Sequence, residues 1–253
     1  MGPHIGCIPF SFPGLPNIRA AFTTRRGGSS RGPYSGGNLS WEVGDAKNDV
    51  LENRNALREL AGFGHWAEAR QVHGVEVLVE PNPLNLDQCA DVQADGLATS
   101  RPDLALVIKT ADCQPILLAH ADGRHIAALH CGWRGNRQGF LQKGVRAFCD
   151  AYGFHPHEVL AVRGPSLGPG ASEFVNFDLE WGEAFRKYHN PTTGNLNLWR
   201  LTKAQLLEAG LLEERIFSID LCTYSLPETF FSYRRDKATG RQAGLIWMDP
   251  AVA

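Results

Sequence analysis

Hydrophobic residues along the chain occur in short blocks or alternate with polar ones, a pattern that favours many short strands. Strands are predicted at residues 18–25, 75–79, 104–108, 115–119, 125–129, 158–162, 216–221 and 243–247. Two of them, 115–119 and 125–129, flank Asp122-Gly123, a residue pair typical of tight turns between antiparallel strands. The centre of the sequence therefore predicts a β-hairpin.

Three segments show the periodicity or the end signals of helices. The first is a helix that Asp45 can cap and that stops at Gly62, and the second spans 136–152. The third begins at a capping box made by Thr202 and Gln205. Strands and helices do not alternate strictly, which argues for mixed sheets with helices outside and against a doubly wound parallel sheet.

Composition places the chain among ordinary globular proteins. Of 253 residues, 43% are hydrophobic and 21% are charged, which excludes a disordered chain, a coiled coil and a collagen. The formal net charge of −2 offers no strong field for a phosphate backbone, so we expect no nucleic-acid partner. No segment approaches the ~20 apolar residues of a membrane helix, so we expect no membrane partner. No repeat or linker divides residues 1–253, which we treat as one domain.

The start of the chain and the cysteines bear on the cellular compartment. Residues 1–12 lack the basic and long apolar regions of a signal peptide. The six cysteines include no C-x-x-C pair, and a chain of this length needs no disulfides to fold. We therefore expect a cytoplasmic protein with reduced thiols.

Three short segments carry side chains that bind transition metals. They are 71–74 (QVHG), 110–113 (TADC) and 130–135 (HCGWRG), which contain His73, Cys113 and His130. With Asp122-Gly123 as the turn, His130 pairs with Pro115, so Cys113 and His130 are diagonal neighbours on one face of the hairpin. A diagonal spacing of roughly 7–8 Å lets a metal ion sit between a thiolate and an imidazole. Spacing alone leaves the alternatives open, namely a buried thiol and a histidine held by ordinary polar contacts.

Further motifs follow the order found in one known family. They are FTTR (22–25) with GG (27–28), VGD (43–45), ENR (52–54), QVHG (71–74), TADC (110–113), GWRG (132–135), FFSYRRD (230–236) and TGR (239–241). With these motifs the chain resembles the polyphenol oxidase or laccase-domain family, also called YfiH-like, from about residue 19 to 246. Members of this family are now regarded as purine nucleoside phosphorylases.

The resemblance implies a fold and a metal site. The fold is an α/β (α+β) four-layer α/β/β/α sandwich with mixed β-sheets, and the implied ligands of a zinc ion are His73, Cys113 and His130. Three protein ligands leave a fourth position for water or substrate, which is the layout of a catalytic zinc site. Copper would also bind this set well, and copper-dependent polyphenol oxidase activity is then an alternative, as an adventitious activity.

The implied activity is the cleavage of adenosine, inosine or guanosine, or of methylthioadenosine, by phosphate to give base and ribose-1-phosphate. Arginine suits oxyanions, and Arg25, Arg54 and Arg134 each lie in a matching motif, with a structural ion pair as the alternative for each. Asn38, in a glycine-rich loop, is a candidate for the ribose or base, or a turn residue. Asp112 is a partner for a histidine N–H or a general acid or base. Cys113, His130 and Asp112 are thus the candidate catalytic residues.

Other functions remain open from the sequence. Adenosine deamination is a natural second activity, since zinc lowers the pKa of bound water. A Cys113–His130 nucleophile pair would make an amidase or deamidase, and structural relatives of the family include such cysteine hydrolases. A true multicopper oxidase needs repeated His-x-His pairs, and among 9 histidines only those of 155–157 have that spacing. A metal-binding protein without activity is the third class. The partners expected are thus a purine nucleoside and phosphate, in a monomer or small homo-oligomer.

The chain departs from the family pattern at Cys131, Ser166 and Ser172. The family usually has alanine, cysteine and tyrosine there. None of the three is a predicted metal ligand, but the wall of the substrate pocket is less certain around the two serines.

Overall fold

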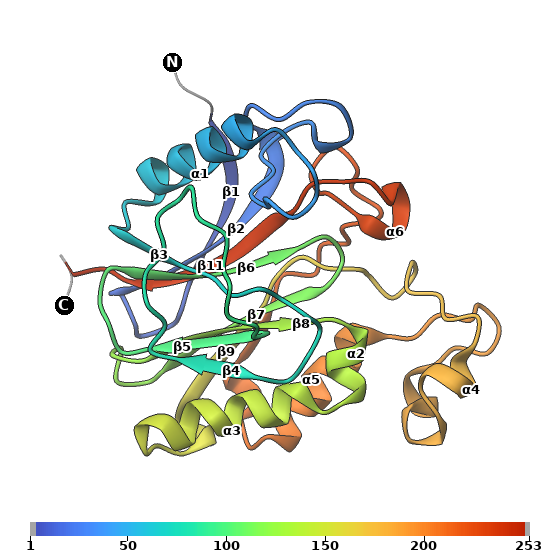
Figure 1. Cartoon of the computed structure of the whole chain (residues 1–253). Helices are drawn as coiled ribbons and strands as arrows, with labels where there is room; N and C mark the ends of the chain where they lie inside the picture. Colours follow the sequence, from blue (N-terminus) through green and yellow to red (C-terminus); the bar gives the residue numbers. More distant parts are fainter. Residues whose placement is uncertain (1–3, 251–253) are drawn as a thin grey trace.

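A computed structural model describes residues 4–250, so residues 1–3 and 251–253 of the predicted 1–253 domain lie outside the described residues. Two β-sheets pack face to face, and helices cover the outer face of each sheet (Figure 1). Both sheets contain parallel and antiparallel neighbours. The predicted four-layer α/β/β/α sandwich with mixed sheets is therefore confirmed.

The first sheet, within the described chain, has five strands in the order β1-β2-β11-β6-β3. Their bounds are β1 (Ile5–Ser11), β2 (Ile18–Gly27), β11 (Gln242–Met248), β6 (Leu104–Thr110) and β3 (His65–Ala67). Helix α1 (Lys47–Ala61) lies over the outer face of this sheet (Figure 1). Strands β1 and β3 were not predicted, because the sequence of β1 shows no regular alternation of apolar and polar residues and β3 has only three residues.

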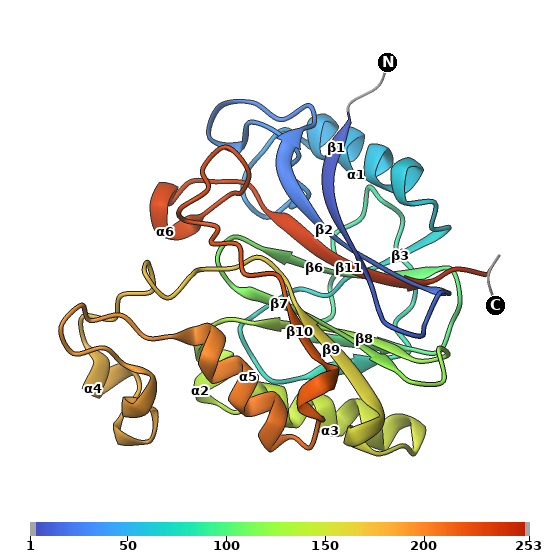
Figure 2. The same cartoon turned by 180° about the vertical axis from the view of Figure 1, so that it is seen from behind.

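The second sheet, in the same part of the chain, has six strands in the order β10-β9-β7-β8-β5-β4. Their bounds are β10 (Ile216–Ser218), β9 (Val159–Arg163), β7 (Gln114–His120), β8 (Ile126–Cys131), β5 (Gly96–Thr99) and β4 (Val77–Val79). Its outer face is covered by α3 (Phe140–Tyr152) and α5 (Leu198–Glu208), as Figure 2 shows from behind. The remaining helices are α2 (Trp133–Arg137), α4 (Phe177–Glu180) and α6 (Tyr233–Asp236).

The continuous apolar runs of the central strands follow from this layering. In β6, Leu106 and Ile108 belong to the core between the two sheets, while Ala105 and Val107 belong to the core under α1. Strand β7 is divided in the same way between the core of the sandwich and the core under α3 and α5. Because both faces of these strands are buried, the sequence shows no polar alternation there.

Two predicted helix starts were wrong. Helix α1 begins after Ala46, and Asp45 accepts a hydrogen bond from the Ala46 N–H and another from the Asn38 side chain, so it does not cap the helix. Helix α5 begins at Leu198, four residues before the predicted cap Thr202, with Asn197 accepting from the Arg200 N–H. The predicted capping residues Thr202 and Gln205 lie inside this helix and are buried.

The predicted 136–152 helix is divided into α2 and α3. Gly139 lies between them with φ of 69°, a left-handed conformation that interrupts the helix and that glycine adopts without strain. Thr202 and Gln205 of α5 both accept hydrogen bonds from the side-chain amide of Asn136 in α2, at 3.1 and 2.8 Å. This buried contact fixes α2, which begins within the 130–135 segment, against α5.

No helix among residues 4–250 combines the length and apolar character needed to cross a bilayer. All six cysteines lie within the described chain and are free thiols. The segment with α4 projects to one side of the sandwich in both views (Figure 1, Figure 2).

Candidate active site

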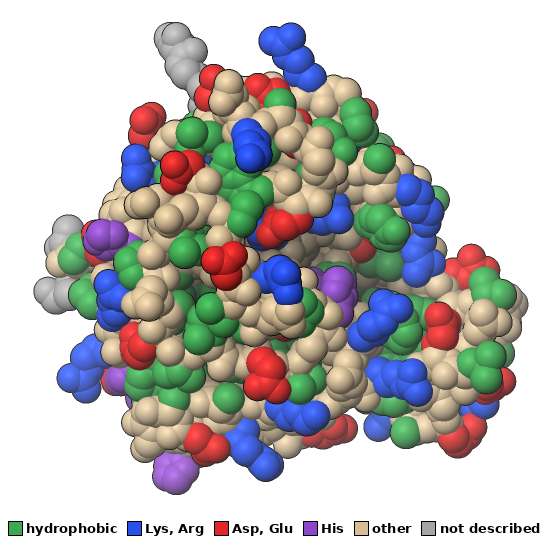
Figure 3. Space-filling model, in the orientation of Figure 1, with side chains coloured by type: hydrophobic (Ala, Val, Ile, Leu, Met, Phe, Trp, Pro, Cys, Tyr) green, Lys and Arg blue, Asp and Glu red, His purple; other side chains and the backbone are tan. Residues whose placement is uncertain are grey.

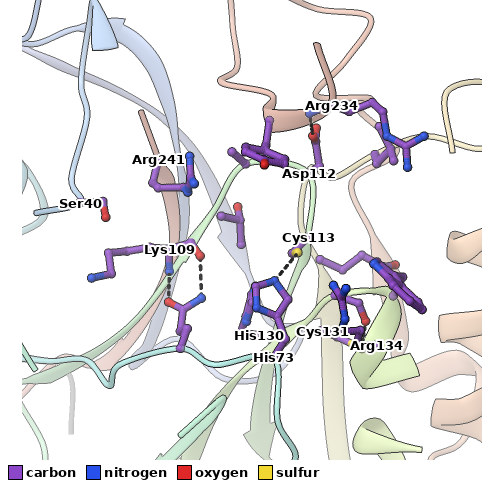
Figure 4. Close-up of a pocket in the computed structure, with 18 of the residues that line it drawn as sticks. Ser40, His73, Lys109, Asp112, Cys113, His130, Cys131, Arg134, Arg234 and Arg241 are labelled. Carbon is purple, nitrogen blue, oxygen red and sulfur yellow. Dashed lines mark hydrogen bonds between the residues drawn. The ribbon is translucent and has the colours of Figure 1, made fainter. Parts of the chain in front are cut away.

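The β7–β8 hairpin has the register that its turn residues predict. Pro115 pairs with His130, and Gln114 pairs with Cys131. Cys113, just before β7, therefore lies diagonally from His130 at the open end of the hairpin. Both side chains point to the same region (Figure 4).

The third predicted ligand, His73, comes from the loop between β3 and β4. Its Nε2 lies 3.7 Å from the Cys113 sulfur, and its ring lies edge-on to the ring of His130 with 4.8 Å between the centroids. Ligand atoms of His73, Cys113 and His130 all lie within 4.8 Å of one another. A thiolate and two imidazoles at these separations fit a zinc ion with metal–ligand distances of about 2.0–2.3 Å.

Gly132 leaves the space that this group of side chains occupies. A Cβ atom at this position would lie 2.9 Å from the Cys113 sulfur and 3.0 Å from Cδ2 of His73. Any side chain at position 132 would thus displace two of the three metal-binding residues. The glycine of the GWRG motif is required by this close approach.

Asp95 organises the site, and the sequence analysis did not identify it. Its carboxylate is buried, and Oδ1 accepts a hydrogen bond of 2.7 Å from Nδ1 of His130. The same carboxylate accepts the backbone N–H groups of Val72, His73 and Gly74, at 3.1, 2.9 and 2.6 Å. Since the carboxylate accepts from Nδ1, Nε2 of His130 is left as the ligand atom, an arrangement typical of metal-bound histidines.

The charges in this group favour a thiolate. Burial opposes ionisation of Cys113, but the adjoining His130 and His73 together hold the pKa of its thiol at about 6. Burial opposes the imidazolium of His130, but the Cys113 thiolate and Asp95 raise its pKa. The thiolate is the form of cysteine that binds metals and attacks electrophiles.

Asp112, the predicted histidine partner, is engaged elsewhere. Its Oδ1 accepts from the Thr223 hydroxyl at 2.7 Å and its Oδ2 from the backbone N–H of Arg234 at 2.6 Å. The structure gives Asp95, and not Asp112, as the carboxylate bonded to His130. Asp112 joins the end of β6 to the first turn of α6 and lies on the cavity wall (Figure 4).

The three predicted metal ligands open into a cavity of about 930 Å³. Of the described residues, those with cationic side chains that line it are Arg70, Lys109, Arg134, Arg234, Lys237 and Arg241. Figure 3 shows a hollow on this face between the sandwich and the projecting α4 segment, with Lys and Arg side chains beside it and a histidine visible within it. The cavity is therefore suited to an anionic ligand.

Arg54 and Asn38 are not among the described residues that line this cavity. Arg54 is fully buried, with Nη2 donating to both carboxylate oxygens of Glu68 at 3.1 Å. Asn38 is also fully buried, and its side chain bonds to Ser40, Asp45 and the backbone N–H of Arg241. Asn38 thus positions two cavity residues, Ser40 and Arg241. Arg54 instead forms a buried ion pair with Glu68 and has a structural role.

The other two predicted arginines differ in location. Arg134 lies on the cavity wall, with its guanidinium 4.4 Å from the ring centroid of Trp133. Arg25 lies elsewhere, where it donates to the carbonyls of Ser35 and Pro227 at 3.2 Å and covers the ring of Phe231. Of the four predicted substrate-binding residues, the structure brings Arg134 to the metal-binding group.

The residues that depart from the family pattern are buried. Ser166 accepts hydrogen bonds from Trp199 and Arg163, at 2.9 and 3.2 Å, and Ser172 donates to the backbone carbonyl of Leu196. Neither serine is among the described residues that line the cavity, whereas Cys131 is.

Two charged residues of the cavity, Arg241 and Lys109, lie in or beside the sequence motifs but were not among the predicted site residues. The TGR motif contains Arg241, whose Nη1 donates to the carbonyls of Thr239 and Gly240 at 2.9 Å. Lys109 precedes the TADC motif, and its ammonium binds Glu42 at 2.8 Å and Glu68 at 3.3 Å. Because Arg241 lies in the TGR motif, it could have been named as a candidate from the sequence. The sequence does not show, however, that Arg241 lines the cavity whereas Arg54 does not.

Two bacterial proteins are similar to this chain over nearly its whole length. The purine nucleoside phosphorylase YfiH of Escherichia coli strain K12 is 37% identical over 242 residues, which cover 91% of this chain and 94% of that protein. A purine nucleoside phosphorylase of Xylella fastidiosa strain Temecula1 is 38% identical over 253 residues, covering 94% and 95%.

Solved structures agree with this result. YlmD from Geobacillus stearothermophilus superposes with a TM-score of 0.85 at 27% identity and covers 96% of both chains. A Neisseria meningitidis protein superposes with a TM-score of 0.83 at 31% identity, covering 96% of this chain and 99% of that one. The profile of the family described as multi-copper polyphenol oxidoreductase laccase matches residues 19–249. On its sequence, its fold and its near full-length relatives, the chain belongs to this laccase-type, YfiH-like family.

Proposed function

We propose that this chain is a zinc-dependent purine nucleoside phosphorylase. The observation that carries the proposal is that His73, Cys113 and His130 meet at a cavity in which, among the described residues, cationic side chains outnumber the two acidic ones, Glu42 and Asp112. The names of the curated relatives support the phosphorylase activity. The cavity volume of about 930 Å³ is ample for a nucleoside together with phosphate.

The metal donors are the side chains of His73, Cys113 and His130. Zinc bound to three protein ligands would supply a Lewis acid with one open position. Asp95 fixes the ring of His130, and Gly132 leaves room for the donors. The same donors suit copper, so the metal in the purified protein has to be measured.

Arg241 is the residue that we assign to phosphate. Its guanidinium is anchored by two backbone carbonyls, so it is held in place before phosphate binds. Burial lowers its pKa, opposed by the negative charges of Cys113 and Asp112, and an arginine stays protonated. Lys109 is less available, because Glu42 and Glu68 already neutralise its charge.

Aromatic side chains on the same wall suit a purine. Trp133, Phe174 and Tyr233 line the cavity, and the first two pack against each other with 5.8 Å between ring centroids. A planar base gains from stacking on such rings. These residues would hold the base while Arg241 holds the phosphate beside the sugar.

In the reaction, a phosphate oxygen forms a bond to the anomeric carbon and the bond from that carbon to the base nitrogen breaks. The electron pair leaves with the base, which then takes a proton. The sugar develops positive charge on the way, and an oriented phosphate anion stabilises that charge. Holding phosphate and sugar together accounts for several kcal/mol of the barrier in such reactions.

Adenosine deamination at the same site is a finer part of the proposal. It replaces the amino group at C6 with oxygen from water and releases ammonia. The support is the metal-binding group itself, since zinc lowers the pKa of bound water to about 7.

A second candidate function rests on a different observation. Asp95, His130 and Cys113 are arranged in the order of an orienting carboxylate, a base and a nucleophile. This order, with a thiol pKa of about 6, also fits a cysteine-dependent amidase or deamidase. His73 beside the sulfur favours the metal, because a nucleophile needs only one histidine.

The test is to incubate the zinc-loaded protein with inosine and to follow hypoxanthine, ribose and ribose-1-phosphate by chromatography. We expect hypoxanthine and ribose-1-phosphate with phosphate, and no base release without it. Arg241→Gln should raise the KM for phosphate at least tenfold. Arg146→Gln is the matched control, because Arg146 is exposed on α3 and absent from the described residues that line the cavity.

Free ribose released equally with and without phosphate would refute phosphorolysis. Activity that survives removal of the metal and is lost on alkylation of Cys113 would favour the thiol mechanism instead.

A further inference from the structure

The turn of the β7–β8 hairpin carries a second group of metal-binding side chains, at the end opposite to Cys113 and His130. His120 ends β7, Asp122 lies in the turn and His125 directly precedes β8. Asp122 lies between the two rings, with Oδ1 2.9 Å from Nδ1 of His120 and Oδ2 3.1 Å from Nδ1 of His125. One ligand atom from each residue lies within 4.8 Å of the other two.

The two imidazoles are largely shielded and held in place, while Asp122 is an exposed residue whose side chain is partly covered. The exposed fractions are 11% for His120 and 21% for each of Asp122 and His125. His120 stacks on Phe154 with 4.1 Å between centroids, and His125 packs on Tyr152 at 4.5 Å. The two rings therefore cannot turn freely away from the carboxylate.

The backbone of the turn is fixed as well. The side-chain amide of Asn17 donates to the carbonyl of Gly123 at 2.7 Å. The Arg124 N–H donates to Oδ1 of Asp122 at 2.8 Å, which sets the direction of the carboxylate. The donors are therefore already arranged without an ion.

The far nitrogen of His120 gives independent evidence. Its Nε2 is buried without a hydrogen-bond partner among the described residues, and Oε2 of Glu158 lies 3.8 Å away. Its Nδ1 accepts a long hydrogen bond of 3.3 Å from the Asp122 N–H. An ion on Nδ1 would place the proton on Nε2, facing the Glu158 carboxylate. A carboxylate next to the outer nitrogen is the usual surrounding of a metal-bound imidazole.

We propose that His120, Asp122 and His125 form a second site for a divalent transition-metal ion of the zinc type, separate from the active site. Two imidazole nitrogens and one carboxylate oxygen are donors that zinc accepts, with a fourth position open to water. The neighbouring charges are mixed. Glu158 adds a negative charge, while Arg124 is 80% exposed and lies 3.4 Å from Asp122, so an ion would compete with its guanidinium.

The test is zinc stoichiometry, measured by titration of the metal-free chain with ZnCl₂ and by elemental analysis after dialysis. Wild type should bind about one equivalent more than His125→Ala, as a single three-donor site implies. Asp122→Asn, which keeps the acceptor for the Arg124 N–H, should lose the same equivalent. His157→Ala is the matched control, because His157 is another histidine near β9 outside the group, and it should bind as wild type does.

The His73→Ala variant distinguishes the two sites, because it removes a predicted zinc ligand of the active site only. In that variant the remaining equivalent should disappear on adding His125→Ala, whether or not the chain has phosphorylase activity. Phosphorolysis by His125→Ala should equal that of wild type. Equal zinc binding by wild type, His125→Ala and Asp122→Asn, with all three folded by circular dichroism, would overturn the proposal.

Discussion

Asp95 and His130 are joined by a 2.7 Å hydrogen bond between two buried side chains, and the same carboxylate accepts the N–H of His73. One carboxylate thus fixes the orientation of one predicted metal ligand and the backbone of another.

Replacing Asp95 should weaken metal binding more than folding. Asp95→Asn lacks the negative charge beside the His130 imidazole and one of the acceptor oxygens for the 72–74 loop. We expect zinc affinity to fall about 10–100-fold. Competition with a chromophoric chelator measures this, and Asp91→Asn, at an exposed position in the segment before β5, is the control. Unchanged affinity in Asp95→Asn would show that the hydrogen bond does not tune the site.

Adding a methyl group at position 132 should disrupt the site. In Gly132→Ala the new Cβ would lie 2.9 Å from the Cys113 sulfur and 3.0 Å from the His73 ring. We expect loss of the zinc equivalent at the active site after dialysis, with thermal unfolding little changed. Gly170→Ala is the matched control, because a Cβ there meets no atom within 4 Å. If Gly132→Ala bound as much zinc as wild type, His73 and Cys113 could not both be ligands in this geometry.

The metal-free protein should have one unusually reactive thiol. With a pKa of about 6 for Cys113, the thiolate fraction rises from about one-tenth at pH 5 to about nine-tenths at pH 7. Burial raises the pKa of Cys7 and Cys149 to about 11, so both stay protonated in this range. The rate of carboxymethylation at Cys113, followed by peptide mass spectrometry, should therefore increase with pH and level off above about pH 7. Added zinc should suppress it, whereas a rate still rising between pH 8 and 9 would contradict the low pKa.

Arg54 should matter for stability and not for phosphate. Arg54→Ala leaves the buried carboxylate of Glu68 with Lys109 as its remaining cation. Loss of one partner of a buried pair typically costs about 3–5 kcal/mol in the free energy of unfolding. Urea denaturation measures this cost. Arg58→Ala, one turn further along α1 and exposed, should change stability by less than about 0.5 kcal/mol. A stable Arg54→Ala variant with a raised KM for phosphate would contradict this structural role and indicate that Arg54 binds phosphate.

Most of the strands and the hairpin register could be predicted from the sequence because they depend on local signals, whereas β1, β3 and β5 were missed. The Asp122-Gly123 turn sets which residues pair, and this alone brings Cys113 beside His130. Helix starts were less predictable where tertiary contacts decide. The hydroxyl of Thr202 looks like a cap, but it accepts a hydrogen bond from Asn136 on another helix, and Asn197 caps instead.

Residues of the site that are distant in sequence from their partners were harder to predict. Asp95 precedes its histidine by 35 positions and lies in no pattern that marks it. Burial decides between arginines that motifs treat alike. Arg54 is on the buried face of α1 and binds Glu68, whereas the backbone of Arg241 is held by Asn38 at the cavity wall, so only the folded chain distinguishes the two arginines.

The hydrogen bond from Arg241 to Asn38 joins positions 203 residues apart, and that from Arg234 to Asp112 joins positions 122 apart. Closing long loops costs chain entropy, so contacts of this separation form slowly compared with a hairpin. During synthesis, the hairpin with Cys113 and His130 emerges before the segment that supplies Arg234 and Arg241. The thiol and imidazole can therefore approach each other in a nascent chain that still lacks part of the cavity wall, and the enclosed site is completed only after Arg234 and Arg241 have left the ribosome.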